Sequence, residues 1–296
     1  MTVLARASEV TRRYGDVLAL DRVSLDIRAG ELVGLLGPNG AGKSTLISLF
    51  AGLRRPSSGT VELLGGSPLD PARRRGIGVT PQETGLPETL RVGEIVDFVR
   101  AHFPEPLARA ELLARFGLED LARRQVGGLS GGQRRRLAVA LAFVGRPRLV
   151  FLDEPTTGLD VEARRTLWDG IRSFHDEGGT VLLTSHYLEE IEALAERVVV
   201  VGHGRVLADD TVAAVRDVVG VRKVSLTAAG LPELPGVLSA ERHDDGRVDL
   251  LTTDPDRLVV ELVRSGAAFS GLEIRPTTLE EAFLTLTANP EEIAHV

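Results

Sequence analysis

The chain has 296 residues, of which 43% are hydrophobic and 26% charged, the composition of a globular protein with a sizeable core. The composition excludes a disordered chain, and the length excludes a single small module. The formal net charge of −7 offers no overall attraction to nucleic acid or to anionic lipid. The chain has no cysteine, which excludes disulfides, thiolate metal sites and a cysteine nucleophile.

The N-terminal segment has scattered charges and lacks the apolar stretch of a signal peptide, so we expect the protein to stay in the cytoplasm. The longest purely apolar run, Leu137–Val144, is far shorter than the roughly 20 residues that span a bilayer. We therefore expect no transmembrane segment.

Short apolar runs alternate with helical stretches over residues 1–215, which is typical of an α/β domain with largely parallel strands. The predicted strands are Ala5–Val10, Val23–Ile27, Glu31–Leu36, Ile77–Thr80, Leu149–Leu152, Thr180–Thr184 and Arg197–Val201. Between residues 83 and 145 the periodicity instead predicts helices, at Val92–Phe103 and Pro106–Phe116. A helical lobe is therefore expected as an insertion in the α/β core.

Residues 216–296 differ from the preceding part of the chain in charge, with 8 basic and 14 acidic side chains and a net charge of −6. The patterns in this region predict, in order, strands at Arg222–Thr227, Val237–Arg242 and Arg247–Leu251, a helix at Arg257–Ser265, a strand at Gly271–Arg275 and a helix at Thr278–Thr287. We interpret this region as a small α+β accessory domain that strengthens dimer contacts or modulates the activity of the first domain.

A glycine-rich loop, Gly37–Thr45, follows the predicted strand Glu31–Leu36 and precedes a helical pattern. Its sequence GPNGAGKST matches G-x-x-x-x-G-K-[ST] in the strand–loop–helix context that this phosphate-binding motif requires. Glycines let backbone N–H groups close around phosphate oxygens, while Lys43 adds a full positive charge. Ser44 is the expected Mg²⁺ ligand, and a nucleoside triphosphate is the expected ligand of the loop.

Two carboxylates, Asp153 and Glu154, follow the apolar strand Leu149–Leu152. The carboxyl ends of such strands are where ligands gather in α/β sheets, so Asp153 is expected to hold a metal and Glu154 to orient or deprotonate water. Acidic residues at a strand end are usually only solvated. The presence of the Lys43 loop in the same chain favours a role for Asp153 and Glu154 in metal binding and catalysis.

A second glycine-bearing loop, Leu129–Gln133 with the sequence LSGGQ, also opens a helical stretch. A helix N-terminus of this kind can bind an anion through its unpaired N–H groups. Ser130 could equally be a simple helix cap, and taken alone the loop leaves both interpretations open.

Together these motifs resemble the ATP-binding subunits of ABC transporters over about residues 3–215. LSGGQ resembles the signature sequence that separates this family from other P-loop ATPases. Further matches follow at Tyr14, which resembles the aromatic residue that stacks on adenine, and at Gln82, which resembles the glutamine that joins the two lobes. Asp160 in Gly158-Leu159-Asp160 and His186, the switch histidine, complete the pattern.

The resemblance implies a P-loop NTPase core that binds ATP and Mg²⁺. It assigns catalysis to Glu154, His186, Lys43 and Gln82, and metal binding to Ser44, Gln82 and Asp153. It assigns nucleotide binding to Tyr14, Gly37, Pro38, Asn39, Gly40, Ala41, Gly42, Lys43, Ser44, Thr45, Gln82, Ser130, Gly131, Gly132, Gln133, Asp160 and His186.

The implied partners are a second ATPase subunit, expected to form a head-to-tail homodimer, and a separate transmembrane permease that holds the chain at the inner face of the membrane. The acidic tail and its segment PTTLEEAFLTLT at 276–287 resemble cassettes of drug and antibiotic exporters. An importer subunit and a non-transport ABC ATPase of DNA repair or translation remain as alternatives. The latter usually has two cassettes, a long coiled coil or a zinc insertion, and this chain shows none of these patterns.

Three other features have ordinary interpretations. The runs Arg73–Arg75 and Arg134–Arg136 are expected to be solvated or helix-stabilising charges, since no aromatic residues interleave them as in a nucleic-acid site. Trp168 is expected in the core.

Overall fold

The computed structural model describes residues 2–80, 85–185, 187–218, 222–228, 230–232, 234–276 and 278–279. The chain divides into two compact units, Met1–Asp209 and Asp210–Val296. Residue 215, the domain boundary expected from the sequence, lies in helix α8 (Val212–Val218) of the second unit.

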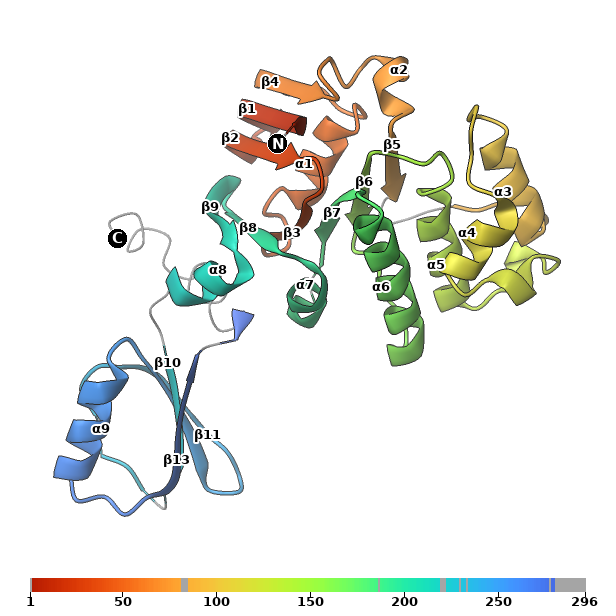
Figure 1. Ribbon diagram of the computed structural model, residues 1–296. Helices are drawn as coiled ribbons and strands as arrows, with labels where there is room; N and C mark the ends of the chain where they lie inside the picture. Colours follow the sequence, from red (N-terminus) through yellow and green to blue (C-terminus); the bar gives the residue numbers. More distant parts are fainter. Residues whose placement is uncertain are drawn as a thin grey trace. The chain divides into compact units, whose positions relative to one another are not determined.

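A six-stranded sheet forms the centre of the first unit (Figure 1). Its order is β5 (Ile77–Thr80), β6 (Leu149–Asp153), β7 (Thr180–Thr184), β3 (Leu32–Leu36), β8 (Arg197–Gly202) and β9 (Arg205–Thr211). The pairs from β5 through β8 are parallel, and every residue of β3, β6 and β7 is buried. Strands buried on both faces give continuous apolar runs, which is why the sequence predicted them.

A separate antiparallel sheet precedes the parallel one, in the order β2 (Val17–Arg28), β1 (Val3–Tyr14), β4 (Ser58–Leu63). The prediction of a largely parallel α/β domain holds for the central sheet, whereas the first two predicted strands belong to this antiparallel sheet. The sequence also failed to predict β4 and β9, because both are mostly exposed edge strands with few inward apolar residues.

Helix α1 (Lys43–Phe50) packs against both sheets of this unit, with contacts to β1, β2, β4 and β6. The shared core includes Phe50, whose ring stacks on that of Phe151 at a centroid distance of 5.9 Å. This packing fixes the axis of α1, and with it the direction of the loop from which the helix starts.

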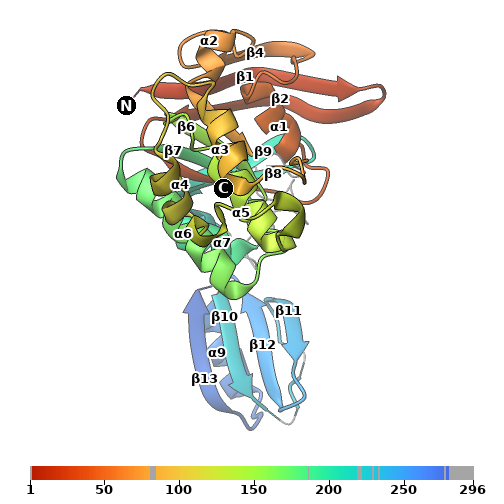
Figure 2. The same cartoon turned by 90° about the vertical axis from the view of Figure 1, so that its right-hand side faces the viewer.

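The predicted helical lobe is present between β5 and β6. It comprises α3 (Val92–Arg100), α4 (Arg109–Arg115), the short 3₁₀ turns η1 (Glu119–Leu121) and η2 (Val126–Gly128), and α5 (Gly131–Leu141). Residues 85–144 of the described chain contain no strand. Helices α3, α4 and α5 lie together in both views (Figures 1 and 2), and α3 contacts the other two.

The remaining helices of the first unit are α2 (Pro71–Arg74), α6 (Val161–Asp176) and α7 (Leu188–Leu194). Helix α6 packs against β7 and α7 against β3, so both helices cover the central strands. In the described part of the chain, no helix has the length and apolar composition needed to cross a membrane.

The second unit is an antiparallel sheet with one helix on its face. The strand order is β11 (Val237–Arg242), β12 (Arg247–Thr252), β10 (Arg222–Thr227), β13 (Ser270–Pro276), and α9 (Pro255–Arg264) packs against β10. Its apolar core contains Val224, Leu226, Val248, Leu250, Leu258 and Leu262. The predicted order strand, strand, strand, helix, strand is confirmed here, whereas all but the start of the expected helix at 278–287 lies outside the described residues.

The other face of this second sheet is polar and centres on the buried carboxylate of Asp249. Lys223 Nζ lies 2.6 Å from this carboxylate, Ser225 donates to it at 2.6 Å, and His243 and Arg247 contact it at 3.0 and 3.3 Å. Burial raises the pKa of Asp249, but these hydrogen bonds outweigh it and hold the pKa well below its ordinary value. Because cations of the chain already neutralise Asp249, this cluster is a structural ion network.

Candidate active site

The loop Gly37–Thr45 connects the end of the central strand β3 to the start of α1. Gly42 caps the helix with φ +103°, a backbone conformation that L-residues with a side chain rarely adopt. A Cβ at Gly42 would also lie 2.5 Å from the Ala19 carbonyl oxygen. Pro38, Asn39 and Gly40 are exposed, so the loop is open to a ligand.

Lys43 is the first residue of α1, and its side chain folds back over the loop. Its Nζ donates to the carbonyls of Gly37 at 2.7 Å and Pro38 at 3.1 Å. Burial lowers the pKa of the Lys43 ammonium, and the nearby carboxylates of Glu154 and Asp153 partly offset this effect. The cation therefore lies close to both carboxylates that the sequence singled out. Ser44, next on the helix, is exposed, and Thr45 is half-buried.

Asp153 ends β6, and β7 separates this strand from β3 in the sheet. Because the three strands are parallel, their carboxyl ends meet at one edge and bring Asp153 toward the Lys43 loop. Its buried carboxylate is oriented by Thr184, whose hydroxyl donates to Asp153 Oδ1 at 2.6 Å. Asp153 and Thr184 are direct partners in the strand register.

Glu154 leaves the strand in a left-handed conformation, with φ +49°. Its backbone N–H donates to the carbonyl and the hydroxyl of Thr184, at 3.2 and 3.0 Å. Thr157 donates to its carboxylate at 3.3 Å. A non-glycine residue persists in this conformation only when its surroundings hold it there, and such strain clusters at functional sites.

The signature loop at Ser130–Gln133 begins α5. The Ser130 hydroxyl accepts from the Gln133 N–H at 3.2 Å, and the Gln133 side chain accepts from the Ser130 N–H at 3.1 Å. The helix-cap interpretation of Ser130 is therefore confirmed as a complete capping box. Ser130 and Gly131 are nevertheless exposed, and Gly132 and Gln133 are half-buried, so the helix N-terminus is accessible to a ligand.

Three further predicted positions lie in the first unit. Tyr14 ends β1 with 41% of its surface exposed, and the guanidinium of Arg12 lies 4.5 Å from its ring centroid. Asp160 caps α6 by accepting from the Ala163 N–H at 2.8 Å. Trp168 is buried, as expected.

Gln82 and His186 lie outside the described residues. Their assigned roles therefore stay predictions from the sequence.

Sequence reasoning missed Arg135 and Arg136, which it interpreted as solvated or helix-stabilising charges. Arg136 donates to the carbonyls of Phe116 and Gly117, both at 3.1 Å, while Arg135 donates to backbone carbonyls around Glu154. Both side chains are half-buried. The sequence Arg134–Arg136 does not indicate that the three arginines have different partners. These partners depend on which part of the fold packs against each face of α5.

Glu190 on α7 is a second missed residue, with 0% of its surface exposed. It accepts from Thr156 Oγ1 at 2.9 Å and from Trp168 Nε1 at 3.0 Å. Burial raises the pKa of its carboxyl, and hydrogen bonds, that from Ser185 first, partly counteract this. The Glu190 carboxyl thereby links three parts of the first unit: Thr156 in the segment after Glu154, Trp168 on α6, and Ser185 after β7.

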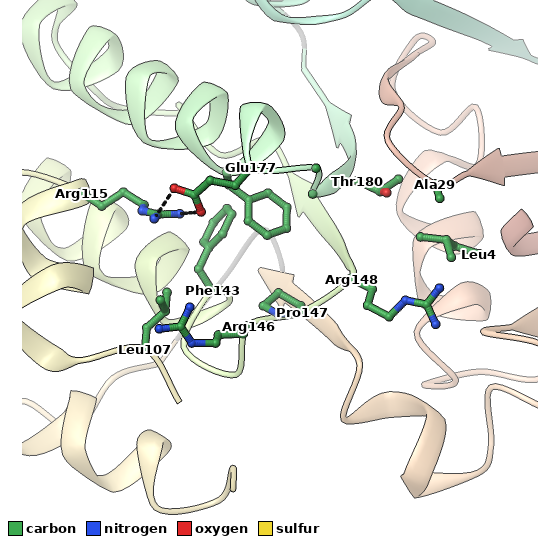
Figure 3. Close-up of a pocket in the computed structure, with 13 residues that line it drawn as sticks. Leu4, Ala29, Leu107, Arg115, Phe143, Arg146, Pro147, Arg148, Glu177 and Thr180 are labelled. Atoms are coloured by element: carbon green, nitrogen blue, oxygen red, sulfur yellow. Dashed lines mark hydrogen bonds and ion pairs between the residues drawn. The ribbon is translucent and has the colours of Figure 1, made fainter. Parts of the chain in front are cut away.

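A pocket of about 360 Å³ lies elsewhere, between residues that include Arg115, Phe143, Arg148 and Thr180 (Figure 3). Arg148 precedes β6 and Thr180 begins β7, whereas Asp153 ends β6, so this pocket is at the opposite edge of the parallel sheet. Arg115 in it is paired with Glu177 at 2.7 Å. The pocket is therefore separate from the candidate active site.

Comparison with known proteins identifies the family. Residues 20–157 match the family described as ABC transporter. The chain is 35% identical to the doxorubicin resistance ATP-binding protein DrrA of Mycobacterium tuberculosis, covering 99% of this chain and 95% of the relative. It is 38% identical to the daunorubicin/doxorubicin resistance ATP-binding protein DrrA of Streptomyces peucetius, over 96% and 92%. It is 36% identical to the Nod factor export ATP-binding protein I of Mesorhizobium japonicum, over 98% and 88%.

Solved structures agree. The structure of an ATP-binding subunit of an ABC transporter superposes with a TM-score of 0.67 at 29% identity, covering 73% of this chain and 93% of that one. A bacterial ABC transporter cassette, solved as a dimer, superposes with a TM-score of 0.63 at 27% identity, covering 70% and 98%. The chain thus belongs to the ABC transporter family, in which it is an ATP-binding subunit with ATPase activity.

Proposed function

We propose that the edge formed by the ends of β3, β6 and β7 is the site at which this chain hydrolyses ATP. The observation that carries the proposal is the convergence of the open Gly37–Thr45 loop, the Lys43 ammonium and the Asp153 and Glu154 carboxylates at one sheet edge. The loop N–H groups and Lys43 bind the phosphates, and the exposed ring of Tyr14 stacks on the adenine.

Mg²⁺ fits the oxygen donors at this edge. The Ser44 hydroxyl is exposed in the first turn of α1, and the Asp153 carboxylate is held in place by Thr184. Hydroxyl and carboxylate oxygens are ligands that Mg²⁺ prefers, and we assign Ser44, Asp153 and the sequence-predicted Gln82 to it. When bound, the ion supplies positive charge to the phosphate oxygens.

Glu154 takes the role of the general base in this proposal. Its carboxylate orients a water molecule and accepts a proton from it as the water oxygen bonds to the terminal phosphorus, while the bond from that phosphorus to the β–γ bridging oxygen breaks and ADP leaves. Lys43 stabilises the negative charge on the phosphate oxygens, and we assign the sequence-predicted His186 to the same terminal phosphate. Asp160 supports the segment that follows Glu154 through its cap of α6.

The test of these roles is the pair Glu154→Gln and Glu154→Asp. The amide keeps the size of the side chain but cannot take a proton, so Glu154→Gln should bind ATP normally while turnover stops. Glu154→Asp keeps the acid and should retain part of the activity. Full hydrolysis by purified Glu154→Gln would remove Glu154 from the mechanism.

We further propose that two chains form a homodimer in which the Ser130–Gln133 loop of one chain faces the ATP bound by Lys43 of the other. The exposed N-terminus of α5 and the dimeric structure of the similar cassette support this arrangement. Ser130→Arg should place bulk at the partner's phosphate site, so that each chain binds ATP but does not turn it over.

A mixing experiment tests the trans arrangement. In a mixed dimer of Ser130→Arg and Lys43→Ala chains, one interface combines the intact Lys43 with the intact Ser130. This interface should regain ATPase activity that neither parent has. A mixture in which mixed dimers form, but activity stays at the parental level, would argue that the loops act within one chain or that both sites are needed together.

We propose that the chain powers a separate permease at the inner face of the membrane and that this transporter exports drugs or other small molecules. The names of the similar proteins, two of them drug-resistance proteins and one an export protein, support export. Co-expression with its permease should lower the cellular accumulation of doxorubicin, and Glu154→Gln should abolish this effect. A neighbouring extracytoplasmic binding protein gene would instead favour import.

A further inference from the structure

The side chain of Arg135 on α5 reaches the backbone immediately around Glu154. Its Nη2 donates to the carbonyls of Asp153 at 2.6 Å and Glu154 at 2.9 Å, and its Nε donates to the carbonyl of Pro155 at 3.2 Å. One guanidinium thus gathers three consecutive carbonyl oxygens. Consecutive carbonyls of a strand point in alternating directions, so this gathering requires the chain to turn sharply at Glu154.

The left-handed backbone of Glu154 is that turn. A non-glycine residue in this region is strained, so neighbouring contacts must hold it. Thr184 holds the N–H side of Glu154 through two hydrogen bonds, and Arg135 holds the carbonyl side. The backbone of the proposed base is therefore clamped from two elements that are distant in sequence.

A guanidinium is suited to this position because its planar, delocalised group presents several donors in fixed directions. A lysine ammonium at the same place could not match the fork that spans three carbonyls. Burial lowers the pKa of Arg135, and the Asp153, Glu154 and Glu190 carboxylates counteract this, so the partly buried cation lies among compensating charges.

The neighbouring arginines do not share this environment. Arg134 lies 3.5 Å from Glu88, and Arg136 donates to the carbonyls of Phe116 and Gly117. Successive residues on a helix point about 100° apart, so the three arginines face different neighbours. Arg135 is the one whose side chain donates to the backbone of residues 153–155. Arg134 is therefore a matched control with the same charge and helix.

We propose that Arg135 is a positioning residue that holds the backbone of Glu154 in its strained conformation and thereby aims the Glu154 carboxylate for ATP hydrolysis. The proposal rests on the proposed role of Glu154 as the base. It predicts an effect on turnover that is separate from nucleotide binding, because Arg135 donates to the backbone carbonyls of residues 153–155, which are not part of the phosphate-binding loop Gly37–Thr45.

The experiment measures kcat, and the Kd for ATP, of the full-length protein. Arg135→Gln should lower kcat about 10- to 100-fold, the loss expected when a catalytic group is misplaced by about 1 Å, with the Kd for ATP within about twofold of wild type. Arg135→Lys, which keeps the charge, should give an intermediate kcat. Arg134→Gln should match the wild type in both quantities.

A double-mutant comparison tests whether Arg135 acts through Glu154. If it does, adding Arg135→Gln to Glu154→Gln should change the residual kcat by less than about twofold, because the group being aimed is already gone. An equal fold-loss in both backgrounds would overturn the proposal. A wild-type kcat for Arg135→Gln, or a loss confined to the Kd for ATP, would also overturn it.

Two results separate this inference from the proposed function. Active Glu154→Gln would remove the base itself, whatever Arg135 does. Inactive Glu154→Gln together with fully active Arg135 variants would refute only the positioning role. If Arg135→Gln does not fold, the conservative Arg135→Lys decides, since wild-type kcat in that folded variant would show that the three-carbonyl fork is not required.

Discussion

Replacement of Gly42 by alanine should damage the phosphate loop more than the same replacement two residues earlier. Gly40 and Gly42 both have positive φ, +81° and +103°, so alanine is strained at either position by about 1–3 kcal/mol. A Cβ at Gly40 meets nothing within 4 Å. A Cβ at Gly42 would lie 2.5 Å from Ala19 O and 2.6 Å from Leu20 Cδ2.

The collision at Gly42 has no simple relief. Ala19 presents a backbone oxygen, and Leu20 is fully buried in the core between the sheets and α1. Overpacking of this kind adds about 1–3 kcal/mol. We therefore expect Gly40→Ala to lower the free energy of unfolding by strain alone, and Gly42→Ala to lower it by strain plus this collision term.

The assay is thermal unfolding without nucleotide, followed by the fluorescence of the single, buried Trp168. At about 2–4 °C per kcal/mol for a unit of this size, the additional collision should lower the Tm of Gly42→Ala about 2–12 °C below that of Gly40→Ala. Omitting ATP removes any contact of the new methyl group with phosphate. Equal Tm values would refute the claim that the close approach to Ala19 and Leu20 requires glycine.

Three further changes test other contacts. Lys43→Ala should weaken ATP binding by about tenfold or more in calorimetric titration, because it removes the cation that faces the phosphates, and an unchanged Kd would contradict this. Thr184→Val should destabilise the fold by about 1.5–3 kcal/mol in denaturant unfolding, because the buried Asp153 carboxylate loses its donor, while Thr184→Ser keeps the hydroxyl and should lose less. For Glu190, burial raises the pKa of the carboxyl in the folded chain, so the folded state holds the proton more tightly than the unfolded state. The free energy of unfolding should therefore fall as pH rises from the ordinary carboxyl pKa through the raised one, and Glu190→Gln should lack this fall; parallel Tm–pH curves for the two proteins would count against it.

The central strands could be predicted from the sequence because burial on both faces leaves an uninterrupted apolar run. Ile77–Thr80 and Thr180–Thr184 have the bounds that were expected. The edge strands β4 and β9 have no such run, since most of their residues are exposed, and their existence depends on the neighbouring strand that each one pairs with. The hydropathy pattern of a strand does not show which strand it pairs with, so β4 and β9 could not be predicted from it.

The phosphate loop could also be predicted, because its chemistry depends on residues that are contiguous in the chain. The conformation of Glu154 could not, since nothing in the letters Asp-Glu-Pro signals a positive φ at a glutamate. That conformation is held by Arg135 and Thr184, which are 19 and 30 residues away in the sequence. Contacts over such separations are set by the packing of α5 and β7 against β6.

The role of the second unit can be tested by a chain that ends at Thr211. This end keeps β9, and with it the two hydrogen bonds of Arg197 to Asp209, at 2.6 and 2.8 Å, so the sheet of the first unit stays complete. The removed unit has its own apolar core and none of the proposed nucleotide-binding residues. We therefore expect the shortened chain to fold and bind ATP with the wild-type Kd, while its dimerisation or turnover changes. A chain that ends at Gly202 is the control: it loses β9 and should unfold at a lower temperature, because Arg197 then lacks Asp209. A Thr211 chain that folds but cannot bind ATP would show that the nucleotide site needs the second unit.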